Sequence, residues 1–263
     1  MKFQENNNIR FITFDIFKQG VVHAVFTRHG GTSPEPWNAL NVGGTVGDLN
    51  ERVRENRYLS FSALGLDRNS MFDVWQVHSA DVVIANAPHP PNGLNRRELM
   101  ADGIITDRPE VSLFMRFADC TPILLYDPWK KAIGIVHAGW QGTVKHVAYQ
   151  TVMAMKAAYG SRPGDILSAI GPSIGPDHYE VGPDVIERVL HSFGSDSATL
   201  FHQIGNKTHF DLWEANRISL QRAGVIQTEM AGLCTACHPE DWYSHRRENG
   251  KTGRFGALMA LAR

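Results

Sequence analysis

Long apolar runs, paired cysteines and an excess of charge of one sign are all scarce in this chain of 263 residues. Its three cysteines, an odd number, do not suggest a framework of disulfide bonds. No apolar run approaches the roughly 20 residues that a membrane-spanning helix needs, and the N-terminal residues lack the apolar core of a signal peptide. We therefore expect a cytoplasmic protein whose reduced cysteines are available for chemistry.

The charges of the chain nearly cancel. Lysine and arginine number 26 against 27 aspartates and glutamates, which leaves a formal net charge of −1. Such a balance gives no electrostatic reason to bind nucleic acid or an anionic membrane. The hydrophobic fraction of 43% and the charged fraction of 20% are ordinary for a globular protein, so we expect a folded protein with a full hydrophobic core.

Short apolar segments rich in Val, Ile and Phe predict most of the secondary structure. The expected strands cover residues 21–27, 72–77, 82–84, 103–106, 111–117, 123–126, 132–136 and 166–170. The expected helices cover residues 50–64, 143–159, 183–192 and 212–223, the last with Asp211 as N-cap and Gly224 at its end. Residues 86–97, rich in proline, are predicted to connect two strands. Because strands and helices do not alternate strictly, the pattern favours an α+β fold with mixed sheets.

One cysteine and two histidines lie at the ends of three of these apolar segments. His78 follows residues 72–77, Cys120 precedes residues 123–126, and His137 follows residues 132–136. Pro122 and Gly139 make the backbone irregular beside them, and such strand ends present side chains to clefts. A cysteine with two histidines forms either a nucleophile with its base or three ligands of an open zinc site. Both interpretations predict an enzyme.

A second group of thiols lies near the C-terminus, in the pattern Cys234-Thr235-Ala236-Cys237-His238. This spacing is typical of c-type haem attachment, of redox pairs or of half a zinc site. Haem attachment normally requires export, and no second pair of cysteines completes a four-thiolate site. We expect two reduced cysteines in a loop.

His178-Tyr179-Glu180, taken with these cysteines, resembles the motif of zinc nucleoside deaminases. The helix that this motif needs is opposed by Gly182-Pro183 directly after it. We therefore do not expect the zinc site here.

The ordered motifs of the chain, taken together, resemble the YfiH-like laccase-domain family, formerly called multicopper polyphenol oxidases and now described as purine nucleoside phosphorylases. The matching segments extend from about Phe26 to the C-terminus: Phe26-Thr27-Arg28-His29-Gly30-Gly31-Thr32-Ser33, Leu40-Asn41-Val42-Gly43, Gln76-Val77-His78, Ala101-Asp102-Gly103, Ala118-Asp119-Cys120-Thr121-Pro122, His137-Ala138-Gly139-Trp140, Gly171-Pro172-Ser173-Ile174-Gly175-Pro176, Tyr179-Glu180-Val181-Gly182, Asp211-Leu212-Trp213, Ser244-His245-Arg246-Arg247 and Thr252-Gly253-Arg254.

The resemblance implies a compact single-domain α+β fold, spanning residues 1–263 with residues 1–15 at the periphery, with central mixed sheets and outer helices. It also implies a zinc ion bound by His78, Cys120 and His137, which leaves one position open for water or substrate. Family members are described as cleaving inosine, adenosine, guanosine and methylthioadenosine with phosphate, and as deaminating adenosine. We expect a monomer or homodimer.

The sequence departs from the family pattern at a few positions. Gln141 stands where a basic residue usually follows the tryptophan, which predicts weaker phosphate binding if that position holds phosphate. Ser79 replaces a usual glycine and is expected to restrict the turn after His78. Ser173 and Asp177 stand where cysteines are often found, so that loop supplies no metal thiolates.

Substrate contacts are assigned from side-chain chemistry. Arg28 and Arg247 are expected to bind phosphate or ribose, because guanidinium pairs well with phosphate oxygens, and Asn41 is expected to bind the base or sugar. Three alternatives stay open: a metal-free cysteine hydrolase or amidase, including an editing role on cell-wall precursors; a copper-dependent polyphenol oxidase, since Cys and His ligands also suit copper; and a zinc-stabilised binding protein without turnover.

Overall fold

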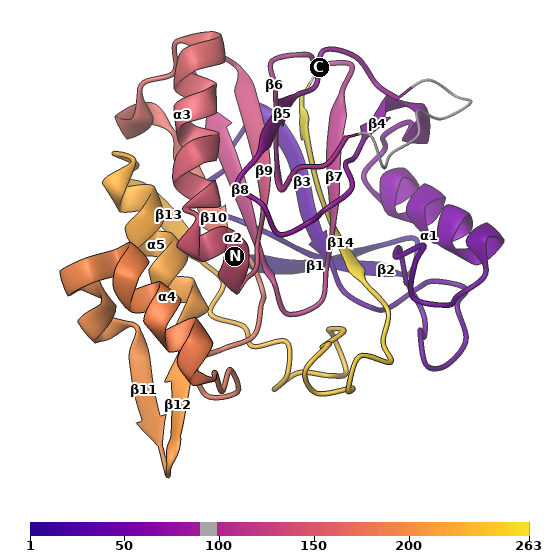
Figure 1. Ribbon diagram of the computed structural model, residues 1–263. Helices are drawn as coiled ribbons and strands as arrows, with labels where there is room; N and C mark the ends of the chain where they lie inside the picture. Colours follow the sequence, from indigo (N-terminus) through magenta and orange to yellow (C-terminus); the bar gives the residue numbers. More distant parts are fainter. Residues whose placement is uncertain (90–98, 263) are drawn as a thin grey trace.

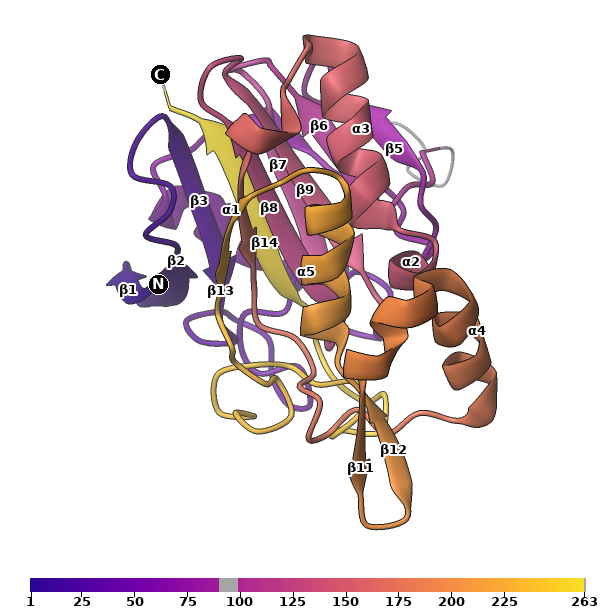
Figure 2. The ribbon, with the colours of Figure 1, turned by 90° about the vertical axis from the view of Figure 1, so that its left-hand side faces the viewer.

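Two six-stranded mixed sheets lie face to face, with helices on their outer surfaces (Figures 1 and 2). The computed structural model describes residues 1–89 and 99–262. The first sheet has the order β1-β2-β3-β14-β7-β4, and the second has the order β13-β10-β8-β9-β6-β5. Each contains antiparallel pairs and at least one parallel pair, such as β4 with β7 and β5 with β6. The α+β class and the mixed sheets are thus confirmed.

The strands of the first sheet are β1 (Lys2–Asn6), β2 (Ile9–Thr13), β3 (Val21–Phe26), β4 (Met71–Phe72), β7 (Ser112–Phe117) and β14 (Phe255–Leu261). Those of the second are β5 (Val82–Ile84), β6 (Gly103–Thr106), β8 (Thr121–Asp127), β9 (Ala132–Ala138), β10 (Leu167–Ile170) and β13 (Gln227–Met230). A separate hairpin joins β11 (Phe201–Ile204) to β12 (Lys207–Phe210). The helices are α1 (Asn50–Ala63), α2 (Trp140–Val144), α3 (Val147–Tyr159), α4 (Pro183–Phe193) and α5 (Leu212–Arg222).

Each central strand contributes side chains to two hydrophobic cores, one on each face of its sheet. In β7, Leu113 and Met115 enter the core between the sheets, while Phe114 packs on the opposite face beneath α1. In β8, Leu124 joins the core between the sheets and Leu125 packs under α3 and α5. Successive side chains of a strand point to opposite faces, so strands covered on both sides are apolar throughout. This explains why their sequences are continuous apolar runs.

The helix expected over residues 143–159 is two helices, and that prediction was wrong at its start. His146 adopts a left-handed backbone conformation with φ of 59° and separates α2 from α3. Its Nε2 lies 2.9 Å from the hydroxyl oxygen of Ser192, and its ring packs against Phe193 at 5.1 Å between centroids. These contacts are made with α4, which is distant in the sequence. The apolar periodicity within residues 143–159 therefore does not reveal that the helix is interrupted at His146.

The strand expected over residues 72–77 covers only its first residue, since β4 ends at Phe72. Beyond it, the side chain of Gln76 takes the place of a peptide group beside β7. Its amide nitrogen donates to the carbonyl of Arg116 at 2.8 Å, and its amide oxygen accepts from the backbone N–H of Arg116 at 3.0 Å. The backbone is thereby released from the ladder and can turn toward His78.

Both ends of the chain contribute to the first sheet. β1 is exposed, whereas β2 buries Ile9, Phe11 and Ile12, so of the first fifteen residues β1 alone is a peripheral strand. The C-terminal strand β14, which the apolar pattern did not single out, lies between β3 and β7. The predicted loop at 86–97 falls for residues 90–97 outside the described part of the chain. Across residues 1–89 and 99–262, no helix has both the length and the apolar character to cross a membrane.

A buried histidine in the first sheet makes stability depend on pH. Nε2 of His23 accepts the backbone N–H of Phe14 at 2.8 Å, and its ring packs edge-on against Phe17. Burial lowers the pKa of His23 to about 4, so the neutral ring stabilises the fold fully above pH ~6.5 and this stabilisation is lost as pH falls toward ~4.

We therefore expect His23 to make the free energy of unfolding about 2.5 kcal/mol smaller at pH 4.5 than at pH 7.5. Urea titrations of the wild type and of His23→Gln, whose amide oxygen can still accept from Phe14, isolate this contribution. If the free energies of unfolding of the two proteins differed by the same amount at both pH values, this contribution of His23 would be contradicted.

Candidate metal centre and its cavity

The structure brings His78, Cys120 and His137 together, as the sequence predicted. β8 and β9 pair with Pro122 opposite His137, and this register places Cys120 beside that histidine. The sulfur of Cys120 lies 3.7 Å from Nε2 of His78, and the two imidazole rings are 5.0 Å apart between centroids. One donor atom from each residue lies within 4.8 Å of the others.

The backbone conformation is unusual at His78 and directly before Cys120. His78 has φ of 57° and Asp119, directly before the cysteine, has φ of 77°. Non-glycine residues rarely adopt such angles, and they persist where the surroundings hold them. The Asp119 carboxylate is held by the hydroxyl of Thr235 and the backbone N–H of Arg246, each at 2.6 Å. Ser79, expected to restrict the turn, fits, because the left-handed residue is His78 itself.

Asp102 orients two segments of the centre at once. One carboxylate oxygen accepts Nδ1–H of His137 at 2.8 Å, and the other accepts the backbone N–H groups of Val77 at 3.1 Å and Ser79 at 2.7 Å. Although burial raises the pKa of Asp102, the hydrogen bond and charge of His137 hold it below its ordinary value. A carboxylate behind a histidine fixes its tautomer and leaves Nε2 for a metal ion.

The donors of this centre fit a metal ion with soft and borderline ligands. One sulfur and two imidazole nitrogens are the kinds of donor that zinc and copper take, and three protein ligands leave a position open. Burial tends to raise the pKa of the Cys120 thiol, but the charge and hydrogen bonds of His137 and His78 lower it to about 6. Cys120 therefore reaches the thiolate form that binds metals.

Replacing Asp102 with asparagine should weaken metal binding while leaving the fold intact. Asparagine can still accept from Val77 and Ser79, but it lacks the charge that supports His137. We expect a 10–100-fold fall in zinc affinity, the usual loss for a carboxylate behind a ligating histidine, measured by competition with a chelator. Asp81→Asn, an exposed carboxylate near the same turn, is the control. Equal affinities of the two variants would contradict the assignment.

A cavity of about 810 Å³ opens above the three side chains. Among the described residues, its walls carry five arginines against the single carboxylate of Asp119, and aromatic rings from Trp75, Trp140 and Tyr179. The arginines are Arg54, Arg57, Arg116, Arg246 and Arg254. A smaller cavity of about 260 Å³ shares His78 and Cys120 with it and is lined also by Gln141. The centre thus faces a volume typical of small-molecule sites, with a strongly cationic wall.

The three side chains predicted to contact substrate do not line this cavity. Arg28 lies over the ring of Tyr243 and donates to the carbonyl groups of Asn38 and Pro239, on another face. Arg247 donates to the carbonyl of Ala236 at 2.8 Å.

Asn41 is fully buried, and its side-chain oxygen accepts the backbone N–H of Arg254 at 2.9 Å. That bond places Asn41 directly behind a residue of the cavity wall.

Sequence reasoning gave no role to Asp102 or to the arginines that line the cavity. Asp102 and Arg254 lie within the family motifs, but only the pairing of β6 with β9 reveals what Asp102 contacts. Arg54 lies in α1, where nothing in the local pattern distinguishes it from a solvated residue. Arg54 can be recognised only from its place among the arginines of the folded cavity, which the linear sequence does not show.

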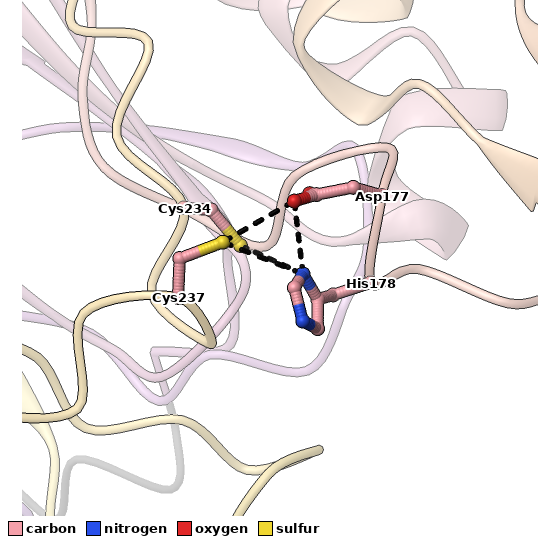
Figure 3. Close-up of side chains that lie close together, drawn as sticks. All are labelled: Asp177, His178, Cys234 and Cys237. Carbon is pink, nitrogen blue, oxygen red and sulfur yellow. Dashed lines mark hydrogen bonds and ion pairs between the residues drawn. The ribbon is translucent and has the colours of Figure 1, made fainter.

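The two C-terminal cysteines have closer polar neighbours than the sequence predicted (Figure 3). His178 and Asp177 lie against Cys234 and Cys237, so the cysteines are not merely two thiols in a loop. Glu180 does not join them, because its carboxylate pairs with Lys207 at 2.7 Å. No helix runs through residues 177–180, in keeping with Gly182-Pro183. The deaminase-like motif is therefore not formed.

Comparison with known proteins agrees with this geometry. Residues 22–262 match the family model described as multi-copper polyphenol oxidoreductase laccase. The chain is 39% identical over 243 residues to "Purine nucleoside phosphorylase" of Deinococcus radiodurans, covering 92% of this chain and 90% of that protein. It is 34% identical over 248 residues to "Purine nucleoside phosphorylase YlmD" of Bacillus subtilis, covering 92% and 88%.

Among solved structures, the hypothetical protein YfiH of Bacillus licheniformis superposes with a TM-score of 0.89 at 32% identity, covering 99% of both chains. The family model spans nearly all of the described chain, and the relatives exceed 30% identity over most of their length. The chain therefore belongs to the YfiH-like laccase-domain family.

Proposed function

We propose that the protein is a zinc-dependent purine nucleoside phosphorylase that also deaminates adenosine, acting on inosine, adenosine, guanosine and methylthioadenosine. The observation that carries the proposal is the coupling of a His-Cys-His centre to a cavity with a cationic wall. A nucleoside and phosphate together need such a volume and such a charge. Names of relatives that are 34% and 39% identical support the same activity. A single domain in the cytoplasm, where thiols stay reduced, completes the proposal.

The arginines of the wall divide into two groups. Arg57 and Arg116 lie beside Asp73, whose carboxylate is 3.8 Å and 2.7 Å from them, so their charge is partly balanced. Arg254 donates through Nη1 to the carbonyl groups of Thr252 and Gly253. Burial lowers its pKa, yet an arginine keeps its charge. We assign Arg254, with Arg54 and Arg246, to phosphate.

In phosphorolysis, a phosphate oxygen forms a bond to C1′ as the bond from C1′ to the purine nitrogen breaks, and the electron pair of that bond leaves with the base. Arginines that hold phosphate at C1′ supply orientation, which is a large part of such catalysis. Trp75 and Tyr179 line the same cavity, and we assign the purine to this aromatic part of the wall. Asp102 keeps the Nδ1 proton on His137 throughout, so the other ring nitrogen faces the centre.

Zinc bound at His78, Cys120 and His137 would act as a Lewis acid and would activate water for deamination. We assign these three residues a catalytic role through the metal. Arg28, Asn41 and Arg247 were predicted to contact substrate, and we propose a supporting role instead. Asn41 fits it best, since it fixes the backbone of Arg254.

Removing the charge of Arg254 should weaken phosphate use. A hydrogen bond to a charged group contributes about 1.5–3 kcal/mol, so Arg254→Met is expected to lower kcat/KM for phosphate roughly 10–100-fold. Initial rates at saturating inosine and varied phosphate measure the effect. The control is Arg162→Met, which removes an arginine with 80% of its side chain exposed. A wild-type kcat/KM for phosphate in Arg254→Met would refute the assignment.

One observation favours a second candidate, a cysteine hydrolase. Cys120, His137 and Asp102 follow one another as nucleophile, base and orienting carboxylate. Burial would lower the pKa of His137, but Cys120 and Asp102 raise it to about 9, while burial and the two histidines together set the pKa of Cys120 at about 6. A thiolate–imidazolium pair is thus favoured without metal. This candidate requires activity that survives chelators.

Adenosine separates these functions in one experiment. With phosphate, the proposal predicts adenine and ribose 1-phosphate; without phosphate, it predicts inosine from deamination. Both should disappear after zinc removal and return when zinc is added. Turnover of neither kind in the zinc-loaded protein, or turnover unaffected by chelation, would contradict the proposal.

A further inference from the structure

A second cluster of metal-type donors lies on two loops beside the cavity (Figure 3). Asp177 and His178 belong to the loop after β10, and Cys234 and Cys237 belong to the loop after β13. One donor atom from each residue lies within 4.8 Å of all the others. The four side chains come from segments more than fifty residues apart, so their convergence is a product of the fold.

Four of the six donor separations are close to the edges of a tetrahedron around zinc. Nδ1 of His178 lies 3.1 Å from Oδ2 of Asp177, 3.4 Å from the sulfur of Cys237 and 3.8 Å from that of Cys234. The Asp177 oxygen lies 3.2 Å from the Cys237 sulfur. Bonds of about 2.0 Å to nitrogen or oxygen and about 2.3 Å to sulfur require donor separations of about 3.3–3.8 Å.

The backbone around the cluster holds the thiols in place without any ion. The N–H of Gly175 donates to the sulfur of Cys234 at 3.2 Å. Ser173 and Cys234 form a parallel bridge between the loops, and the N–H of His238 closes the turn onto the carbonyl of Cys234 at 3.2 Å. These contacts place Cys234 beside the loop of Asp177 and His178.

The chemistry of the donors selects the ion. Two sulfurs and an imidazole favour zinc or another thiophilic metal over magnesium or calcium, and the carboxylate completes four ligands. A set of four protein ligands leaves no open position, unlike the set at His78, Cys120 and His137, and closed sites are structural. The buried Cys234 anchors the set, while the other three residues are exposed enough for an ion to enter.

We propose that Asp177, His178, Cys234 and Cys237 bind a structural zinc ion, separate from the centre at Cys120. The ion cross-links the two loops that form one side of the cavity. Tyr179 and Ile174, which line the cavity, flank the ligands on the first loop. On the second loop, Thr235 holds the carboxylate of Asp119, next to Cys120. The expected effect of the ion is rigidity of this wall.

The test uses the Cys120→Ala protein, in which any metal thiolate must come from Cys234 or Cys237. After purification in reducing buffer, elemental analysis should find about one zinc per chain, against about two in the wild type. Exchange with cobalt should give an intense thiolate-to-cobalt charge-transfer band. Adding Cys237→Ser should remove both the metal and the band, and should lower the melting temperature by at least about 5 °C.

Two results would overturn the proposal. One is a Cys120→Ala protein without zinc and without a cobalt–thiolate band. The other is a Cys234–Cys237 disulfide that persists in reducing buffer, detected by mass spectrometry. Asp177→Asn and His178→Gln, at exposed positions, provide the same readout if Cys237→Ser does not fold: each should weaken cobalt binding at least about tenfold. Unchanged cobalt affinity in both would also refute it.

Discussion

Phosphorolysis of inosine is expected to fall at least about 100-fold in the Cys120→Ala variant, because the centre loses its sulfur donor. Loss of a carboxylate that is hydrogen-bonded to a metal ligand already lowers metal affinity or activity 10–100-fold. Loss of the ligand itself should lower activity further. Cys120 lies between β7 and β8 with its sulfur against His78 and Gly139. The measurement is kcat/KM for inosine at saturating phosphate, with zinc content determined on the same samples.

Cys120→Ser is the matched variant for this experiment. Serine has nearly the shape of cysteine but its hydroxyl is a poor metal ligand at neutral pH, so activity and the zinc ion of this centre should be lost together. Unfolding curves close to that of the wild type would show that the fold is preserved. Full activity in Cys120→Ala would contradict the assignment of the centre, and phosphorolysis by zinc-free wild type would contradict its dependence on zinc.

Gly139→Ala is expected to disable the centre through a single methyl group. A Cβ at this position would lie 2.7 Å from the sulfur of Cys120 and 3.0 Å from Cδ2 of His78. The contact with the sulfur is too short for unbonded atoms, and the contact with His78 is tighter than most contacts of a Cβ atom, so the sulfur must move and the donor geometry changes. Because a displacement of about 1 Å can cost 100-fold in rate, we expect a loss of at least that size, with reduced zinc affinity.

The control for this prediction is Gly164→Ala, far from the cavity. A Cβ there would find its nearest neighbour, in the side chain of Ile226, at 3.4 Å, which is ordinary contact. Neither glycine has a positive φ, so backbone strain does not distinguish the two. Steady-state rates and chelator competition should differ between the variants. Wild-type values in Gly139→Ala would show that Cys120 and His78 do not approach this glycine closely in the working enzyme.

The three central side chains could be predicted because each follows or precedes an apolar segment. Their partner Asp102 could not be assigned a role, since its contact with His137 depends on β6 pairing antiparallel with β9, Gly103 opposite Val136. The same limit applied to the second cluster. Cys234 meets the loop of His178 through the bridge to Ser173 and the N–H of Gly175, and no spacing rule connects residues so far apart.

Local patterns were reliable where burial alone determines structure and failed where tertiary contacts replace local ones. β5 and β6 have the bounds that the apolar runs predicted. The break at His146 and the loss of strand after Phe72 both arise from side chains that bond to other elements, as Gln76 does with β7. The sequence also did not reveal the contacts of Arg28, which is held by carbonyl groups that only the folded chain gathers.

The most direct test of the proposed function is phosphorus NMR of zinc-loaded protein with inosine and inorganic phosphate. We predict a sugar-phosphate resonance from ribose 1-phosphate that grows in step with free hypoxanthine and is absent with Cys120→Ala. Hypoxanthine released without the new resonance would indicate hydrolysis of the nucleoside. An unchanged spectrum with intact inosine would contradict the phosphorylase and move the assignment to the thiol hydrolase.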